Sequence, residues 1–163
     1  MMEKMYRCLA IALVIVFLLA TGILVLEDMP NTAEKIGNLR IHMILGGLAG
    51  MLVVARIAMR HRLPAPPAMP GDKLAHAGHM ALNLAILLMA ASGMLLVLQS
   101  GTLDAVFGNG TLPENFKDFT PRKVHGLVAK IAMGLIVLHV GAALHHQLIV
   151  KDGLLSRMRF GGK

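Results

Sequence analysis

The stretch KVHGLVAKIAMGLIVLH, residues 123–139, decides how the rest of the sequence is read. It is an apolar run that carries a histidine near one end, His125, and another at the other end, His139. These positions are fourteen residues apart, which corresponds in an α-helix to about 21 Å of rise and close to four whole turns. The two histidines are therefore predicted to lie on one helix face at two depths.

The composition indicates an integral membrane protein. Of the 163 residues, 56% are hydrophobic and only 15% are charged, and the mean hydropathy is +0.67. Four apolar runs each approach the roughly 20 residues that a helix needs to cross a bilayer; they cover residues 8–26, 38–59, 74–99 and 122–149. The alternation expected of membrane strands is absent. We predict an all-α membrane bundle of four helices, surrounded by lipid, as a single domain over residues 1–163.

The distribution of basic residues predicts the orientation of the bundle. The N-terminus, the connection after the second run and the C-terminal tail, with the flanking Arg56, hold ten Lys and Arg against three acids. The other two connections hold five against six. Both termini are therefore predicted to lie in the cytoplasm. The net charge of +7 is not gathered into a basic patch interleaved with aromatic residues, so we expect no nucleic-acid partner. The single cysteine excludes an internal disulfide and any site built from several cysteines.

Histidines inside a membrane helix need a binding role, because a buried imidazole without a partner costs free energy. Two positions on one face suggest two stacked metal centres, and haem b, a flat apolar group that takes axial imidazoles, suits a helix bundle. The second and fourth runs open with RIH and KVH and cross the membrane in the same direction, so His42 is predicted to face His125 near the outer surface. Gly46 and the glycines after it, Gly47 and Gly50, either leave room for this haem or form a close helix-packing surface.

The inner centre is less defined. His139 lies nearer the inner end of its helix, and His79 lies at a matching depth in the third run, where it is a partner or a near neighbour. The chain contains no H-E-x-x-H, P-loop or G-x-S-x-G motif, so we do not expect a hydrolase or an NTPase.

Three segments together resemble the bacterial cytochrome b561 family of four-helix, two-haem membrane proteins. They are IHMILGGLAGMLVVARIAMRHRLPAPP, LAHAGHMALNLAILLMAASGM and VHGLVAKIAMGLIVLHVGAALHHQLIVKDGLLSRM. The resemblance implies that His42 and His125 ligate an outer haem and that His139 ligates an inner one. In the family the second inner ligand is a histidine of the first helix, where this chain has apolar residues near Leu13. Three states of the inner site stay open: His79 replaces that ligand, the haem is five-coordinate, or the haem is lost.

The resemblance also implies a function. Members of the family move single electrons in the bacterial inner membrane, and one of them is a superoxide oxidase that reduces ubiquinone. Arg122 and Lys123, beside the outer ligand, either attract a small anion such as superoxide or anchor the helix end at the headgroups. Two alternatives stay open: a cytochrome b subunit docked to a dehydrogenase or hydrogenase, and a haem or metal sensor or carrier with a degenerate inner site. Whether the chain is itself an oxidoreductase, and whether it dimerises through small-residue faces, stays open as well.

Overall fold

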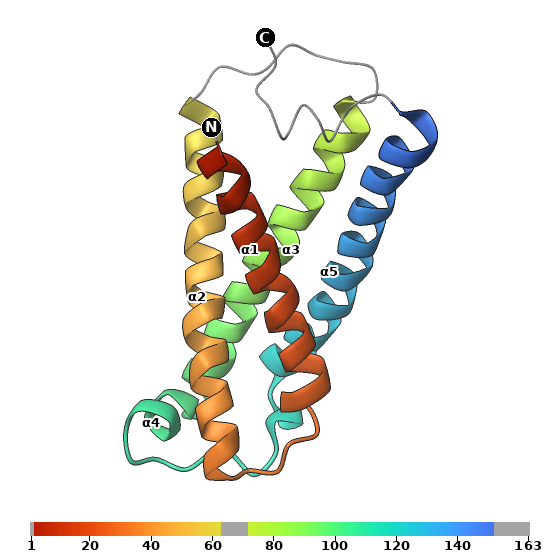
Figure 1. Ribbon diagram of the computed structural model, residues 1–163. Coiled ribbons are helices and arrows are strands. Elements are labelled where there is room, and N and C mark those ends of the chain that lie inside the picture. Colours follow the sequence, from red (N-terminus) through yellow and green to blue (C-terminus); the bar gives the residue numbers. More distant parts are fainter. Residues whose placement is uncertain (1, 63–71, 152–163) are drawn as a thin grey trace.

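The computed structural model describes the backbone of residues 2–62 and 72–151, and the side chains of residues 11–60, 62 and 73–151. All regular secondary structure in these residues is helical (Figure 1). The proline-rich connection that follows Arg62 lies outside the described residues.

Four long helices coincide with the four apolar runs, which confirms the predicted all-helical membrane bundle. They are α1 (Met2–Thr21), which continues as η1 (Gly22–Leu26), α2 (Ala33–Arg62), α3 (Asp72–Ser100), and α5 (Thr120–His145), which continues as η3 (His146–Val150). Three contain segments that are long and apolar enough to cross a membrane: Ala33–Arg60, Lys73–Ser100 and Thr120–Val150. The described apolar part of the first helix, Ile11–Leu26, is shorter.

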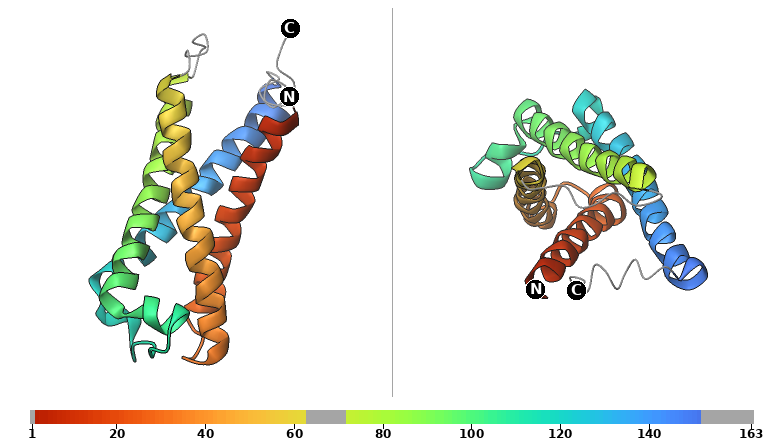
Figure 2. Two further views of the ribbon diagram at one scale, coloured as in Figure 1. Left: turned by 90° about the vertical axis from the view of Figure 1, so that its left-hand side faces the viewer. Right: turned by 90° about the horizontal axis from the view of Figure 1, so that it is seen from above.

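The arrangement of the helices places α2 and α5 on a diagonal. Seen along the bundle, α1 and α3 lie between them on the two sides (Figure 2). The most extensive packing is that of α3 on α5, and α2 packs against both α1 and α3. The start of α1 and the end of η3 lie at one end of the bundle, and α4 (Thr102–Phe107) lies at the other (Figure 1). We call the end of the bundle that contains α4 the α4 end, and the other end the opposite end. Which of the two ends faces the cytoplasm stays a prediction.

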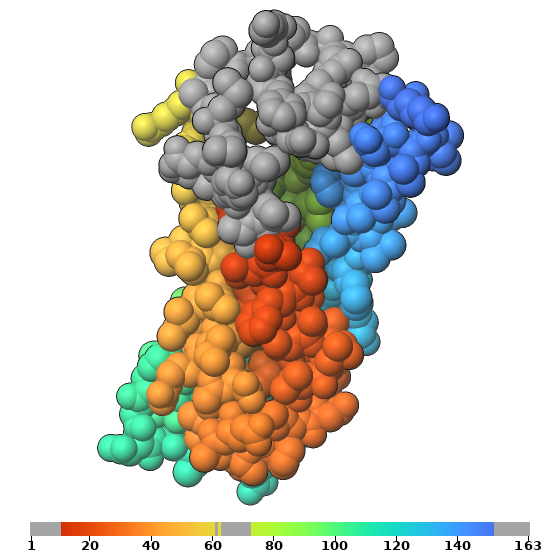
Figure 3. All heavy atoms as spheres, in the orientation of Figure 1, coloured from red at the N-terminus to blue at the C-terminus, as the bar shows by residue number. Residues whose placement is uncertain are grey.

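The surface of the bundle suits a hydrocarbon environment. Large apolar side chains are widely exposed, with Leu74 at 82% and Leu24 at 77%. Figure 3 shows side chains of α1 filling the face between α2 and α5. The buried core is small and joins α1, α3 and α5; its members are Leu19, Ala85, Val128, Ala129 and Ala132. Most of the apolar surface is therefore available to lipid.

The glycines of α2 divide into two groups. A Cβ atom added at Gly50 would lie 2.8 Å from the Cβ of Ala90, so this glycine allows α2 and α3 to approach closely. Cβ atoms added at Gly46 and Gly47 would meet no atom within 4 Å. Gly50 therefore serves close helix packing, whereas Gly46 and Gly47 leave open space beside α2.

The connection between α3 and α5 is more ordered than a plain loop. It contains α4 and η2 (Phe116–Asp118). Arg40 of α2 donates from Nε and Nη2 to the carbonyl oxygen of Val106, at 3.2 Å and 2.6 Å. Its guanidinium also lies 5.7 Å from the ring centre of Phe107. Since Val106 is only 1% exposed, α4 is fastened to α2 as a packed element.

Gly50→Ala is expected to destabilise the bundle by about 1–3 kcal/mol. The new methyl group would lie too close to the methyl group of Ala90, so α2 and α3 would have to separate. The matched control is Gly47→Ala, on the same helix, where the methyl group enters open space and helix propensity improves by up to about 1 kcal/mol. Thermal unfolding in detergent compares the two variants. Equal stabilities would contradict the close packing of α2 on α3.

Candidate functional site

His42 and His125 come together at the α4 end, as the sequence predicts. Their ring centres lie 6.2 Å apart and their planes are inclined by 67°. One ring comes from α2 and the other from α5, so the pair spans the diagonal of the bundle (Figure 2).

Two cavities meet at these imidazoles. One, of about 480 Å³, lies toward α1, η1 and η2, and the other, of about 330 Å³, lies toward α3 and α4. Eight residues line both cavities: Leu18, Leu19, Leu39, His42, Met89, Leu96, Phe116 and His125. Empty space therefore extends from the histidine pair to both sides of the bundle.

The two cavities differ in polarity, and we name them accordingly. Among the residues that line the apolar cavity, only His42, Thr102 and His125 carry polar side chains, and Gly46 and Gly47 contribute bare backbone. The charged cavity is lined by several ionisable side chains besides the histidines: Glu27, Lys35, Glu114, Lys117, Arg122 and Lys130.

Hydrogen bonds fix the proton position on His125. Its Nδ1 lies 3.1 Å from the carbonyl oxygen of Met89 and 3.1 Å from Oγ of Ser92. A carbonyl oxygen only accepts, so Nδ1 carries the hydrogen and donates it. Ser92, which is 5% exposed, donates its own hydrogen to the Leu88 carbonyl oxygen at 2.7 Å and can accept from His125. The other ring nitrogen, Nε2, is left with a free lone pair for a metal.

Two glycines make room for the rings. A Cβ atom at Gly93 of α3 would lie 3.3 Å from Cε1 of His125, and one at Gly22 of η1 would lie 3.3 Å from Cε1 of His42. Nδ1 of His42 is buried and has no hydrogen-bond partner. A polar atom left unsatisfied in this way is unusual and indicates a site that is completed by something bound.

The pair fits an axially ligated iron porphyrin. First-row metals bind imidazole nitrogen at about 2 Å, and the nitrogen lies roughly 1 Å from the ring centre, so two rings on opposite sides of one metal have centres about 6 Å apart. The observed 6.2 Å agrees with this. Two neutral imidazoles are a common donor set for haem, and the cavities on both sides leave room for a flat group. His42 and His125 are thus the residues suited to hold haem, with Gly46 beside them.

The second predicted pair has a different geometry. The rings of His79 and His139 meet at the opposite end, with centres 5.2 Å apart and planes inclined by 59°. Neither residue lines the charged or the apolar cavity, and His139 is exposed. Nearby, Arg60 donates from Nη2 to Nδ1 of His76 at 2.8 Å.

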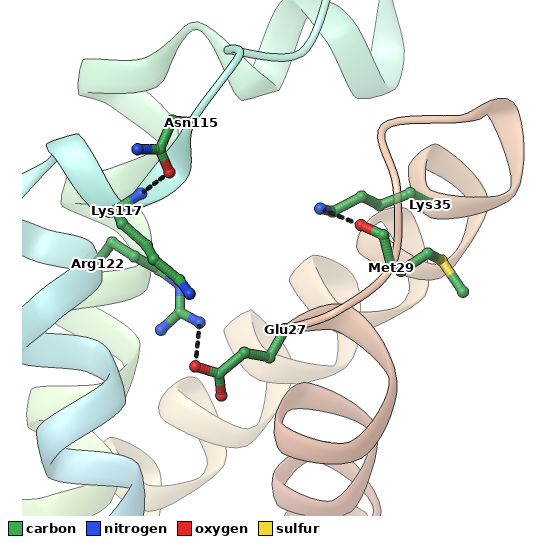
Figure 4. Close-up of polar contacts among 6 residues, drawn as sticks. All are labelled: Glu27, Met29, Lys35, Asn115, Lys117 and Arg122. Atoms are coloured by element: carbon green, nitrogen blue, oxygen red, sulfur yellow. Dashed lines mark hydrogen bonds and ion pairs between the residues drawn. The ribbon is translucent and has the colours of Figure 1, made fainter.

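The charged cavity is lined by cations from three elements, and three of these cations are drawn in Figure 4. Arg122 pairs with Glu27 at 3.8 Å, and Lys117 lines the same cavity. Lys35, only 8% exposed, donates to the Met29 carbonyl oxygen at 2.7 Å and lies over the ring of Phe116. The cations that line the charged cavity therefore belong to α2, η2 and α5.

Sequence reasoning placed Arg122 correctly beside the outer pair but missed other residues of the site. Lys123, which it grouped with Arg122, does not line either cavity. Lys35 lies seven residues before His42, which is two helical turns on the same face, so its spacing could have revealed it. Ser92 and Gly93 carry no such signal, because only the packing of α3 against α5 brings them to His125.

Comparison with known proteins bears on the whole of this arrangement. The profile of one protein family, described as prokaryotic cytochrome b561, matches residues 9–161. The chain belongs to the prokaryotic cytochrome b561 family. Cytochromes b561 are haem-containing membrane proteins of electron transport, so this chain is a bacterial membrane protein that binds b-type haem and transfers electrons.

Individual relatives agree with the family assignment. The chain is 27% identical to the probable superoxide oxidase CybB of Yersinia pestis, over 96% of this chain and 97% of that protein. It is 31% identical to cytochrome b561 homolog 2 of Escherichia coli K12, over 72% of this chain and 68% of that protein. It is 30% identical to cytochrome b561 homolog 1 of the same organism, over 72% of each chain. No solved structure matches the chain.

Ser92→Ala is expected to weaken haem affinity by up to about 10-fold, because it removes one of the two acceptors that hold the imidazole of His125. The effect stays at the low end of the usual range because the Met89 carbonyl oxygen is retained. Haem titration of the apoprotein measures the affinity. Ser100→Ala, in which the lost hydroxyl donates only to its own helix and contacts Thr102, is the control; an equal loss in both variants would contradict a role for Ser92 at His125.

Proposed function

We propose that His42 and His125 hold a haem b at the α4 end and that the protein moves electrons from a periplasmic donor to a membrane quinone. The observation that carries this proposal is the diagonal imidazole pair, 6.2 Å apart, with open space on both sides. A haem held by His42 and His125 would supply one-electron chemistry.

Superoxide is the proposed donor. The name of the Yersinia pestis relative motivates this choice, and the charged cavity supports it. Lys35, Lys117 and Arg122 line this cavity with Glu27 and Glu114 as the acids, and Arg122 already neutralises Glu27 in part. Cations gathered around a recess with low-dielectric walls raise the local concentration of a small anion.

Ubiquinone is the proposed acceptor. Two superoxide anions give up one electron each and leave as two molecules of oxygen, and these two electrons, with two protons, reduce one quinone to quinol. The protein's own residues keep His125 oriented through Met89 and Ser92, exclude water by the apolar lining around the pair, and attract the anion at the mouth.

We also propose an orientation. The α4 end faces the periplasm and both chain termini face the cytoplasm of a bacterium, across its inner membrane, because Lys and Arg are more numerous in the connections at the opposite end. The charged cavity would then open toward the compartment where the anionic donor arrives.

Rapid mixing tests the proposed donor. When purified, oxidised protein is mixed with superoxide, the absorption bands of reduced haem are expected to appear. The rate of this haem reduction is expected to fall as the ionic strength rises. His42→Ala and His125→Ala are expected to lose the haem signal. Absence of haem reduction by superoxide in the loaded protein would remove superoxide from the proposal.

Arg122→Gln is expected to slow haem reduction by superoxide about 10-fold, because it removes a cation from the cavity wall and leaves Glu27 without its partner. Lys123→Gln is the matched control: it makes the same change in net charge one residue away, on a side chain outside both cavities. The second-order rate constants at low salt provide the comparison. If both variants slowed equally, the overall charge of the protein would explain the effect and the charged cavity would have no special role.

A further inference from the structure

The two histidine pairs differ in the space between their rings. The ring centres of His42 and His125 are 6.2 Å apart, as two ligands of one iron require, whereas those of His79 and His139 are 5.2 Å apart. Two axial ligands point at a metal from opposite sides and need about 6 Å. The ring centres of the second pair lie closer together than this requirement allows.

The helices that carry the two pairs explain this difference. α2 and α5 are diagonal, so a flat group can lie between them while α1 and α3 stay in place (Figure 2). His79 and His139 come from α3 and α5, the most extensively packed helices of the bundle. A plate inserted between those two rings would have to separate these helices.

Among the described side chains of α1 and α2, His42 is the only histidine, and it lies at the α4 end. A ligand that faces His139 from a helix other than α3 would have to come from α1 or α2. The sequence has no histidine before His42, and the described side chains of the first helix, from Ile11 to Leu26, are apolar apart from Thr21. In α2 the one histidine toward the opposite end is His61, in the last turn of the helix.

We propose that this chain holds a single haem, at the α4 end, and that electrons therefore enter and leave the protein in the same half of the membrane. The inference rests on the proposed function, because it takes His42 and His125 as the haem ligands. The charged cavity at that pair suits a small anion as the reactant. His79 and His139 then serve as a packing contact between α3 and α5.

The first experiment is the haem-to-protein ratio of the detergent-purified protein, with reduced and carbon monoxide difference spectra. We expect one haem per chain, with a low-spin spectrum and no carbon monoxide shift, since both axial positions are filled. Two haems per chain would overturn the inference and leave the proposed outer ligands intact. A single haem that binds carbon monoxide would contradict its ligation by both His42 and His125, on which the inference rests. A protein without haem would instead overturn the proposed function.

Matched histidine variants assign the haem that is found. His79→Ala and His139→Ala are expected to keep the wild-type haem content and spectrum, whereas His42→Ala and His125→Ala lose both. Loss of half the haem in His139→Ala would show a second haem and overturn the inference. The haem-to-protein ratio of the wild-type protein is measured without any variant. It therefore still decides between one haem and two if a variant fails to fold.

Electron transfer across sealed vesicles provides a second readout. The protein is reconstituted in quinone-free phosphatidylcholine vesicles that contain trapped ferricyanide, and dithionite is added outside. We expect the trapped ferricyanide to be reduced no faster than in protein-free vesicles, whichever way the protein is inserted, because one haem does not span the bilayer. Reduction several-fold faster than this control would show a transmembrane electron path and overturn the inference.

Discussion

The need to satisfy two imidazoles inside an apolar bundle governs the rest of this structure. Each neutral imidazole brings one donor and one acceptor into a buried site, where a polar atom without a hydrogen-bond partner or a ligand costs free energy. On His125 the Met89 carbonyl oxygen and Ser92 satisfy the donor. On His42, Nδ1 is left without a partner. The glycines beside the rings and the diagonal placement of α2 and α5 follow from the space that this pair needs.

The sequence was enough to predict the helices and the depth of the outer pair. Apolar length locates α2, α3 and α5 to within a few residues, and opposite directions of successive helices place His42 level with His125. The ordered connection could not be predicted, because α4 is a short helix held by a tertiary contact from Arg40. The same holds for Ser92, whose contact with His125 depends on how α3 and α5 pack together.

The pair formed by His79 and His139 shows what residue spacing along one helix cannot predict. Fourteen residues put His125 and His139 on one face of α5, but what each ring meets depends on which helix faces it at that depth. His125 meets a ring from the diagonal helix, and His139 meets one from its closest neighbour. One residue type on one helix face therefore stands in two environments, and only His125 lines the charged and the apolar cavities.

The fastened connection at the α4 end has a consequence for how long a cofactor stays bound. Arg40 donates to the carbonyl oxygen of Val106 in α4, and Asn31 donates to the carbonyl oxygen of Pro113 at 2.9 Å. The connection between α3 and α5, which we call the cover, is therefore attached to the rest of the chain at two places. Thr102 and Phe107 of this cover line the apolar cavity. A flat group held beneath it leaves by this route only when these attachments open. Exit along this route is then limited by the rate of a local unfolding event as well as by the strength of the ligand bonds.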